Sequence, residues 1–76
     1  MHQKLMRFKV IKDNRIFEAL LDERLSFNEN FEYIVKLADF DLDGFKVYDP
    51  NKRIFLDTQT PIFWFNINSF KLMYLF

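Results

Sequence analysis

The chain has no cysteine, one glycine, one histidine and two prolines among its 76 residues. Without cysteine, no disulfide can staple the fold, and neither thiolate chemistry nor a zinc–sulfur site is available. Acidic and basic residues cancel, so the chain has no general attraction to nucleic acid or to an anionic membrane. No apolar run reaches the length of about 18 residues that marks a membrane-spanning helix. These absences predict a cytoplasmic protein without direct membrane insertion.

Motifs that carry enzyme chemistry are also missing. The sequence has no glycine-rich phosphate loop, no nucleophile elbow and no histidine–carboxylate spacing. Its one histidine, His2, lies near the N-terminal end, where we expect an exposed residue without a catalytic partner. We therefore expect a protein that is not an enzyme and that uses no cofactor.

Aromatic residues are abundant instead, with eleven Phe, three Tyr and one Trp. Each buries about 150–250 Å² when it enters a core, so this short chain can still build a dense one. The length allows one core, and residues 1–76 are predicted to form a single domain.

Residues 4–21 predict a β-hairpin around a two-residue turn at Asp13 and Asn14. Counting outward from that turn sorts the side chains onto two faces. The outer face carries Arg7 and places Lys9 opposite Glu18, which is a favourable cross-strand pair. The inner face is entirely apolar and consists of Met6, Phe8, Val10, Phe17, Ala19 and Leu21.

A helix is predicted over residues 27–38. Ser26 and Glu29 have the spacing of a capping box, which fixes the start of a helix. Large apolar side chains then recur at helical intervals, at Phe27, Phe31, Ile34 and Ala38.

The rest of the chain predicts short strands. Residues 45–48 and 53–56 flank a turn at Asp49-Pro50-Asn51-Lys52. Residues 61–67 predict a helical turn or an irregular crossover, and residues 70–76 a last strand with Met73 on its open face. The order ββαββ…β predicts an α+β fold in which one helix packs across one face of the sheet.

This order resembles the β-grasp fold of ubiquitin-like proteins, with a mixed sheet. The most specific stretch is residues 62–67, Ile-Phe-Trp-Phe-Asn-Ile, where ubiquitin has a leucine, two polar residues and Tyr-Asn-Ile. Two features depart from that pattern. Asn68-Ser69 replaces the usual Gly-Asp turn, and the chain ends in Tyr74-Leu75-Phe76 without Gly-Gly, so conjugation is not expected if the chain is complete.

Among ubiquitin-like proteins, the pattern is most similar to the small YukD-like accessory proteins of bacterial type VII secretion, whose helix begins on a spacing like that of Leu25-Ser26-Phe27. The resemblance implies a protein-binding module whose partner is a component of the secretion machinery. It also implies an open sheet face, on which the third and fifth strands lie beside the first.

That open face is the candidate site. It is predicted to gather a basic patch with one tyrosine and one methionine, which are useful contacts at interfaces. The predicted residues are Arg7, Lys9, Lys46, Tyr48, Lys71 and Met73. A plainer interpretation is that the lysines only keep the sheet soluble. Nucleic-acid binding by stacking on Tyr48 is an alternative function, against which the neutral charge argues.

Apolar residues beyond the needs of one buried face predict self-association as a homodimer. They are Ile11, Ile16, Leu20, Met73 and Leu75, with Phe63 and Trp64 as additions.

The stretch Asp39-Phe-Asp-Leu-Asp-Gly44 resembles the start of a calcium loop. Asp39, Asp41, Asp43 and Gly44 stand at positions 1, 3, 5 and 6, but position 12, which needs a bidentate Glu, is Pro50. The pattern favours an acidic helix exit that holds no metal, and leaves a weak calcium site as the alternative.

Overall fold

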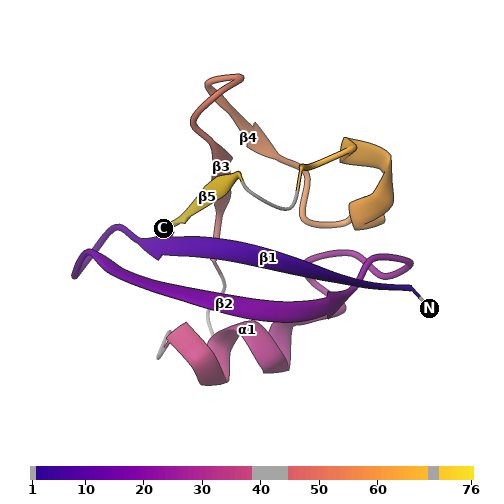
Figure 1. Ribbon diagram of the computed structural model, residues 1–76, viewed down its shortest axis with the longest axis horizontal. Coiled ribbons are helices and arrows are strands. Elements are labelled where there is room, and N and C mark those ends of the chain that lie inside the picture. The colour runs from indigo at the N-terminus through magenta and orange to yellow at the C-terminus, as the bar shows by residue number, and fades with distance from the viewer. Residues whose placement is uncertain (1, 39–44, 69–70) are drawn as a thin grey trace.

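The structure is a computed structural model that describes residues 2–38, 45–68 and 71–76. In chain order its elements are β1 (Gln3–Val10), β2 (Arg15–Asp22), α1 (Phe31–Ala38), β3 (Val47–Asp49), β4 (Ile54–Leu56), the 3₁₀-helix η1 (Ile62–Phe65) and β5 (Leu72–Leu75) (Figure 1). The predicted calcium-loop residues, 39–44, lie outside the described residues.

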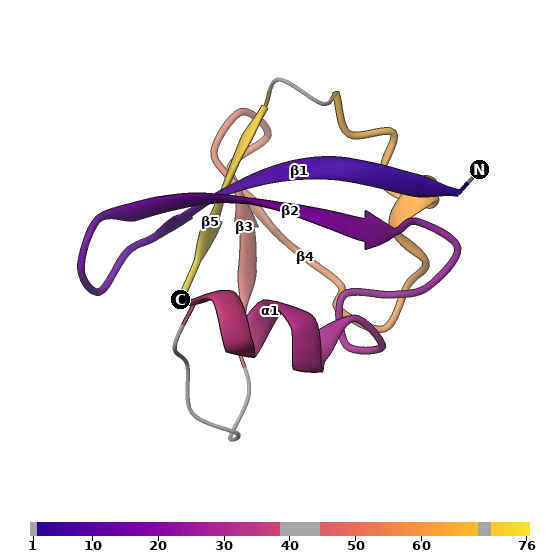
Figure 2. The same cartoon turned by 60° about the horizontal axis from the view of Figure 1, so that its bottom comes forward.

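The five strands form one mixed sheet in the order β2-β1-β5-β3-β4. β5 runs parallel to β1, and the other neighbouring strands are antiparallel. The helix α1 lies on one side of this sheet, close to β2 (Figures 1 and 2). The predicted α+β architecture is confirmed. One detail differs: β5 lies beside β1 as expected, whereas β3 lies beside β5.

The β1–β2 hairpin has the predicted faces but a different register. Val10 lies opposite Arg15, so the loop holds four residues, of which Asn14 has a positive φ of 62°. Arg7, and not Lys9, therefore faces Glu18. The shift is two residues, and because side chains alternate with period two, every side chain keeps its face. The observed register places Phe8 opposite Phe17, with ring centroids 5.4 Å apart.

The capping box forms as predicted, but α1 begins later than expected. The Ser26 N–H donates to Glu29 Oε1, and the Glu29 N–H donates to Ser26 Oγ, each over 3.0 Å. Residues 27–30 form a turn instead of helix. The Asn30 side chain explains this tight entry, because its Nδ2 donates to the carbonyls of Ser26 at 2.8 Å and Asp22 at 3.2 Å. The turn is thereby tied to the end of β2.

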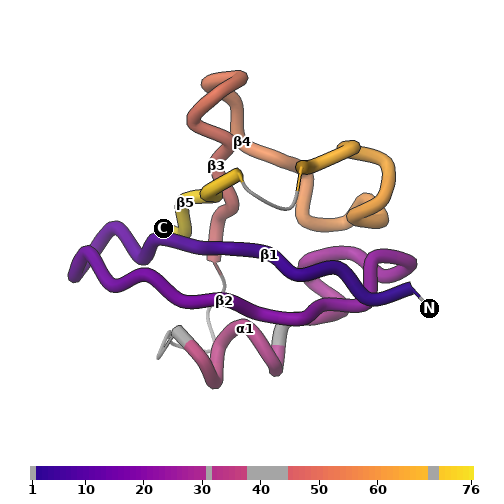
Figure 3. Tube along the Cα trace, viewed as in Figure 1, coloured from indigo at the N-terminus to yellow at the C-terminus, as the bar shows by residue number. Residues whose placement is uncertain are grey.

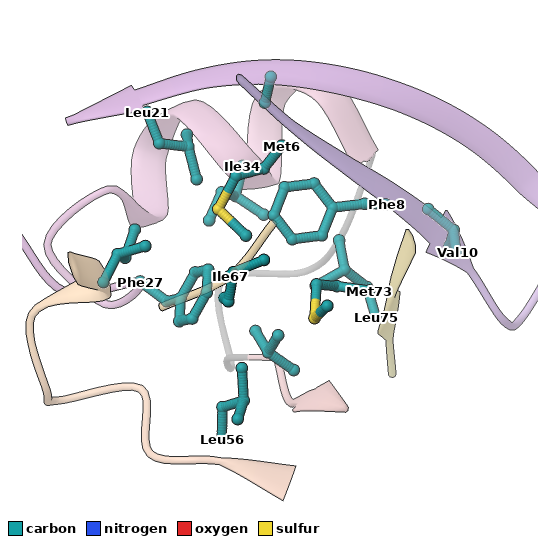
Figure 4. Close-up of a cluster of buried hydrophobic side chains, with 13 residues drawn as sticks. Met6, Phe8, Val10, Leu21, Phe27, Ile34, Leu56, Ile67, Met73 and Leu75 are labelled. Atoms are coloured by element: carbon teal, nitrogen blue, oxygen red, sulfur yellow. The ribbon is translucent and has the colours of Figure 1, made fainter. Parts of the chain in front are cut away.

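The core lies between the sheet and α1 (Figure 4). Its thirteen buried hydrophobic residues are Met6, Phe8, Val10, Ala19, Leu21, Phe27, Ile34, Val47, Leu56, Ile62, Ile67, Met73 and Leu75. They come from all five strands, from α1, from η1, from the turn before α1 and from the residues after η1. Phe8 and Phe27 meet edge to face at its centre, with ring centroids 6.3 Å apart.

Met73 and Leu75 belong to this core with 0% exposure, so their predicted place on the open face is wrong. In Figure 4 the Met73 side chain points into the cluster beside Leu75. Leu72 and Tyr74 alternate with them and face the open side. β5 is apolar on both faces, so its alternation carries no sign of which face is buried. Lys71, which suggested the opposite assignment, precedes the strand.

The turn between β3 and β4, at the top of Figure 3, has the predicted mechanism. The Asp49 carboxylate accepts hydrogen bonds from the N–H groups of Asn51 at 2.9 Å and Lys52 at 3.3 Å. Arg53 follows in the left-handed region with φ 59°, and its N–H donates to the Asp49 carbonyl at 2.8 Å. Asp49 is buried, and its Oδ1 atom accepts both of these bonds from the turn.

The crossover before β5 contains the predicted helical turn, η1. Ile62 and Phe63 donate their N–H groups to the carbonyls of Leu25 and Glu23, both over 3.0 Å, which fastens η1 to the segment after β2. Ile62 enters the core, whereas Phe63 and Trp64 are 51% and 69% exposed.

Candidate functional site

One row of side chains crosses the open face of the sheet, opposite α1. Lys9 on β1 lies opposite Tyr74 on β5. Tyr74 lies opposite Tyr48 on β3, and Tyr48 lies opposite Phe55 on β4. Residues that lie opposite each other on neighbouring strands project from the same face. Four strands therefore contribute one residue each to a continuous row.

Three residues of this row and Phe76 form an aromatic cluster, defined here as Tyr48, Phe55, Tyr74 and Phe76. Tyr48 is at its centre, with ring centroids 4.9 Å from Phe55, 6.1 Å from Tyr74 and 6.2 Å from Phe76. Phe55 and Phe76 also meet each other at 5.7 Å. Most of these rings meet edge to face, an arrangement that aromatic pairs prefer.

Backbone pairing beyond the end of β5 places Phe76 in this cluster. The N–H of Phe76 donates to the Lys46 carbonyl, and the N–H of Lys46 donates to the Phe76 carbonyl, both over 3.0 Å. The β3–β5 ladder thus continues by one pair past Val47 and Leu75. The Phe76 ring follows Tyr74 on the open face because it lies two residues further along the strand.

The outer rings of the cluster are open to solvent. Phe55 is 56% exposed and Phe76 is 46% exposed, while Tyr48 and Tyr74 are half-buried between their neighbours. Contiguous exposed apolar surface on a folded protein is often a site of contact.

Two lysines border the cluster. The Nζ atom of Lys9 lies 6.0 Å from the centroid of the Tyr74 ring, and the Nζ atom of Lys46 lies 6.0 Å from that of Phe55. A cation at this distance over a ring face is attracted by the ring quadrupole. The candidate site therefore has an aromatic centre and a positive rim.

The structure brings together only part of the predicted site. Lys9, Lys46 and Tyr48 gather at the aromatic cluster. Arg7 lies on the same face one row away, opposite Leu72 and 3.9 Å from Glu18. Lys71 is half-buried just before β5, and Met73 is in the core, so neither joins the cluster.

Sequence reasoning missed Phe55, Tyr74 and Phe76. A signal for Phe55 was available, because counting outward from the predicted turn at residues 49–52 places Phe55 on the same face as Tyr48, although the observed pairing of the two is shifted by two residues. Tyr74 and Phe76 could be predicted only if the face of β5 that is buried had been assigned correctly.

The carboxylates with a lowered pKa lie away from the cluster, at Asp13 in the β1–β2 loop, Asp22 at the end of β2 and Asp57 after β4. Side-chain hydrogen bonds from Arg24 lower the pKa of Asp22. The Gln59 N–H and the Thr60 hydroxyl, both donating over 2.9 Å, lower the pKa of Asp57. Asp22 and Asp57 both hold turns, and we assign them structural roles.

Other kinds of site find no support in the described part of the chain. It holds no group of three or more histidines and carboxylates placed to bind a metal ion. The carboxylates of the alternative calcium site, Asp39, Asp41 and Asp43, lie outside it. No helix in residues 2–38, 45–68 and 71–76 is long and apolar enough to span a bilayer.

The sequence matches no protein-family model and no curated protein. Solved structures do match. The chain resembles the UBL domain of yeast Ddi1 with a TM-score of 0.74 and 10% sequence identity, over 99% of this chain and 88% of that one. The fold is ubiquitin-like.

A second ubiquitin-like structure agrees. The C-terminal ubiquitin-like domain of mouse tubulin-specific chaperone e matches with a TM-score of 0.68 and 11% identity, over 97% of this chain and 84% of that one. At such low identity the likeness shows the fold alone. The predicted β-grasp is thus confirmed, and the resemblance to YukD-like proteins stays a prediction.

Proposed function

We propose that this ubiquitin-like domain is a non-enzymatic module that binds a protein partner through the aromatic cluster and its two lysines. The observation that carries the proposal is the arrangement of three rings around Tyr48 on the sheet face opposite α1, with Phe55 and Phe76 about half exposed. Aromatic residues are enriched at protein interfaces and dominate their binding energy.

The cluster is suited to binding because its rings already hold one another in place. Ordering a free side chain at an interface costs about 0.5–1.5 kcal/mol, and rings that are packed in the free protein avoid much of that cost. Complete burial of a Phe side chain contributes about 1.5–3 kcal/mol, so two half-exposed phenylalanines supply a useful apolar anchor.

The positive rim indicates the chemistry of the partner. Lys9 and Lys46 stand on two sides of the rings, over Tyr74 and Phe55. A partner with an apolar centre and carboxylates around it would match this pattern. Charges at a rim govern the association rate and the choice of partner more than the affinity.

The finer setting of this function is also a proposal. The resemblance of the sequence to YukD-like proteins supports an accessory role in bacterial type VII secretion, with a component of that machinery as the partner. The homodimer stays a prediction with a smaller basis, because Ile16 and Leu20 are exposed, at 54% and 47%, whereas Met73 and Leu75 lie in the core. The presence of secretion genes beside the gene for this protein would test the setting.

Charge reversal on the rim tests the binding surface. Capture experiments from the native host would compare the wild type with a Lys9→Glu/Lys46→Glu double variant. The matched control is Lys12→Glu/Lys36→Glu, which makes the same change of charge at exposed positions away from the cluster. A partner lost by the first variant and kept by the control supports the proposal. Equal capture of the partner by both variants refutes it. So does a wild-type protein that captures no protein partner but shifts nucleic acid in a low-salt gel.

A further inference from the structure

The free edge of β2 carries a second binding feature, apart from the aromatic cluster. β2 and β4 are the two edges of the sheet, and β2 is the longer, with eight residues against three. A sheet edge presents unpaired N–H and C=O groups to which another extended chain can add. Figure 1 shows β2 on the outer side of β1.

Three hydrogen bonds determine which residues of β2 point their backbone N–H and C=O groups away from the sheet. Glu23 donates to the His2 carbonyl, so odd-numbered residues of β2 bond to β1 in the observed register. The Ile11 N–H donates to the Leu75 carbonyl on β5. Odd-numbered residues of β1 therefore point their backbone groups toward β5, and even-numbered residues point theirs toward β2. The Asp22 N–H donates to the Asn30 side chain and not to β1. The backbone groups of Ile16, Glu18, Leu20 and Asp22 therefore face away from the sheet.

Asn30 closes this edge at one end. Its Oδ1 accepts from the Asp22 N–H at 3.3 Å, and its Nδ2 donates to the Asp22 carbonyl at 3.2 Å. The carboxamide thus takes the place of a neighbouring strand. Within the part of the chain that the structure describes, Ile16, Glu18 and Leu20 are the residues of β2 whose outward backbone groups have no such partner. An extended segment that pairs with this edge would therefore span the stretch from Ile16 to Leu20.

A second copy of the chain is a poor occupant of this edge. Antiparallel pairing of all three residues with another β2 would place Ile16 opposite Leu20 and Glu18 opposite the other copy's Glu18. Like charges directly opposite each other destabilise a strand pair. Glu18 therefore acts against self-association through β2, as charged residues on sheet edges commonly do.

The same pattern favours a different chain. On the open side of β2, the exposed side chains run Ile16, Glu18, Leu20, with the acid between two aliphatic residues. Arg7 reaches Glu18 only at 3.9 Å, and the Glu18 side chain is 57% exposed. We infer that the β2 edge pairs with an extended segment of a partner protein that carries a basic residue opposite Glu18 and aliphatic residues opposite Ile16 and Leu20. This site does not depend on the aromatic cluster.

A peptide titration tests this inference. The probe is a blocked peptide with the core Ile-Val-Lys-Val-Leu flanked by serines, added to the ¹⁵N-labelled chain. Binding is followed by amide chemical shifts and by hydrogen exchange. The expected result is protection of the Ile16, Glu18 and Leu20 amides by at least about tenfold, because pairing closes an open edge. A peptide with Glu in place of the central Lys should bind at least about tenfold more weakly.

Charge exchange in the protein makes the test specific. Glu18→Lys should prefer the Glu-centred peptide, whereas the control Glu32→Lys, an exposed position on α1, should keep the preference of the wild type. Phe55→Asp should bind the Lys-centred peptide normally, which separates this site from the proposed function. Equal binding of both peptides, shifts confined to the aromatic cluster, or concentration-dependent protection of β2 without peptide would overturn the inference.

Discussion

Tyr48 and Tyr74 lie directly opposite each other on β3 and β5, and their rings stack with centroids 6.1 Å apart. This pair joins the two halves of the open face, since Tyr48 also touches Phe55 and Phe76. Tyr48→Ala should lower the free energy of unfolding by about 1–3 kcal/mol, because half-buried ring contacts on three sides are lost. Tyr48→Phe keeps the ring and should stay within about 0.5 kcal/mol of the wild type. Chemical denaturation measures both, and equal effects of the two variants would show that the ring contacts contribute little.

Adjacent residues of β5 should respond very differently to truncation. Met73→Ala should cost about 2–5 kcal/mol, because Met73 is fully buried and its removal leaves a cavity. Leu72→Ala removes a half-buried side chain on the open face and should cost less than half as much. Thermal and urea denaturation of the two variants compares them. A larger loss for Leu72→Ala would mean that the faces of β5 are reversed.

The capping box gives a third prediction. Ser26→Ala should destabilise the protein by about 1 kcal/mol, because the Glu29 N–H loses its acceptor at the helix entry. Glu29→Gln keeps an oxygen acceptor for the Ser26 N–H and serves as the matched control, with a change below about 0.5 kcal/mol. Unfolding curves monitored by circular dichroism give both values. A neutral Ser26→Ala would argue against the cap.

Stability should fall at acid pH through the carboxylates that hold turns. The folded state lowers the pKa of Asp57 and of Asp22, so it favours their ionised forms. Their contribution is present above the ordinary carboxyl range and is lost as pH falls below about 4 and through the lowered values. Melting temperatures between neutral pH and pH about 3 should decline. The decline should be shallower in Asp57→Asn, which removes one titrating group. An identical decline in that variant would exclude Asp57 as a source.

The sequence predicted the architecture well where apolar and charged residues alternate clearly or where a local cap or turn motif is present. Met6, Phe8 and Val10 alternate with charged residues, so the inner face of the first hairpin was clear even though its register was not. The capping box at Ser26 marked the helix entry, and Asp49 with Pro50 marked the second turn. Each of these signals is local and depends on few neighbours.

The candidate site was only half predictable because its residues come together through β5. Leu72, Met73, Tyr74 and Leu75 are apolar without alternation, and a change of one position exchanges the two faces. Only the neighbouring strands decide which face is buried, and that information is absent from the strand itself. The later start of α1 has a similar origin, since the Asn30 side chain bonds to the end of β2, eight residues earlier.

The central claim is that the aromatic cluster is a protein-binding surface, and Phe55 offers its most direct test. Phe55 and Phe63 are exposed to nearly the same degree, 56% and 51%, but Phe63 lies on η1 away from the cluster. Partner capture from the native host, quantified by mass spectrometry, would compare Phe55→Asp with Phe63→Asp. The melting temperatures of the two variants are measured first, so that a loss of folding is not mistaken for a loss of binding. Phe55→Asp should lose the captured partner by at least about tenfold while Phe63→Asp retains it. Retention by Phe55→Asp, or equal loss in both variants, would contradict the account.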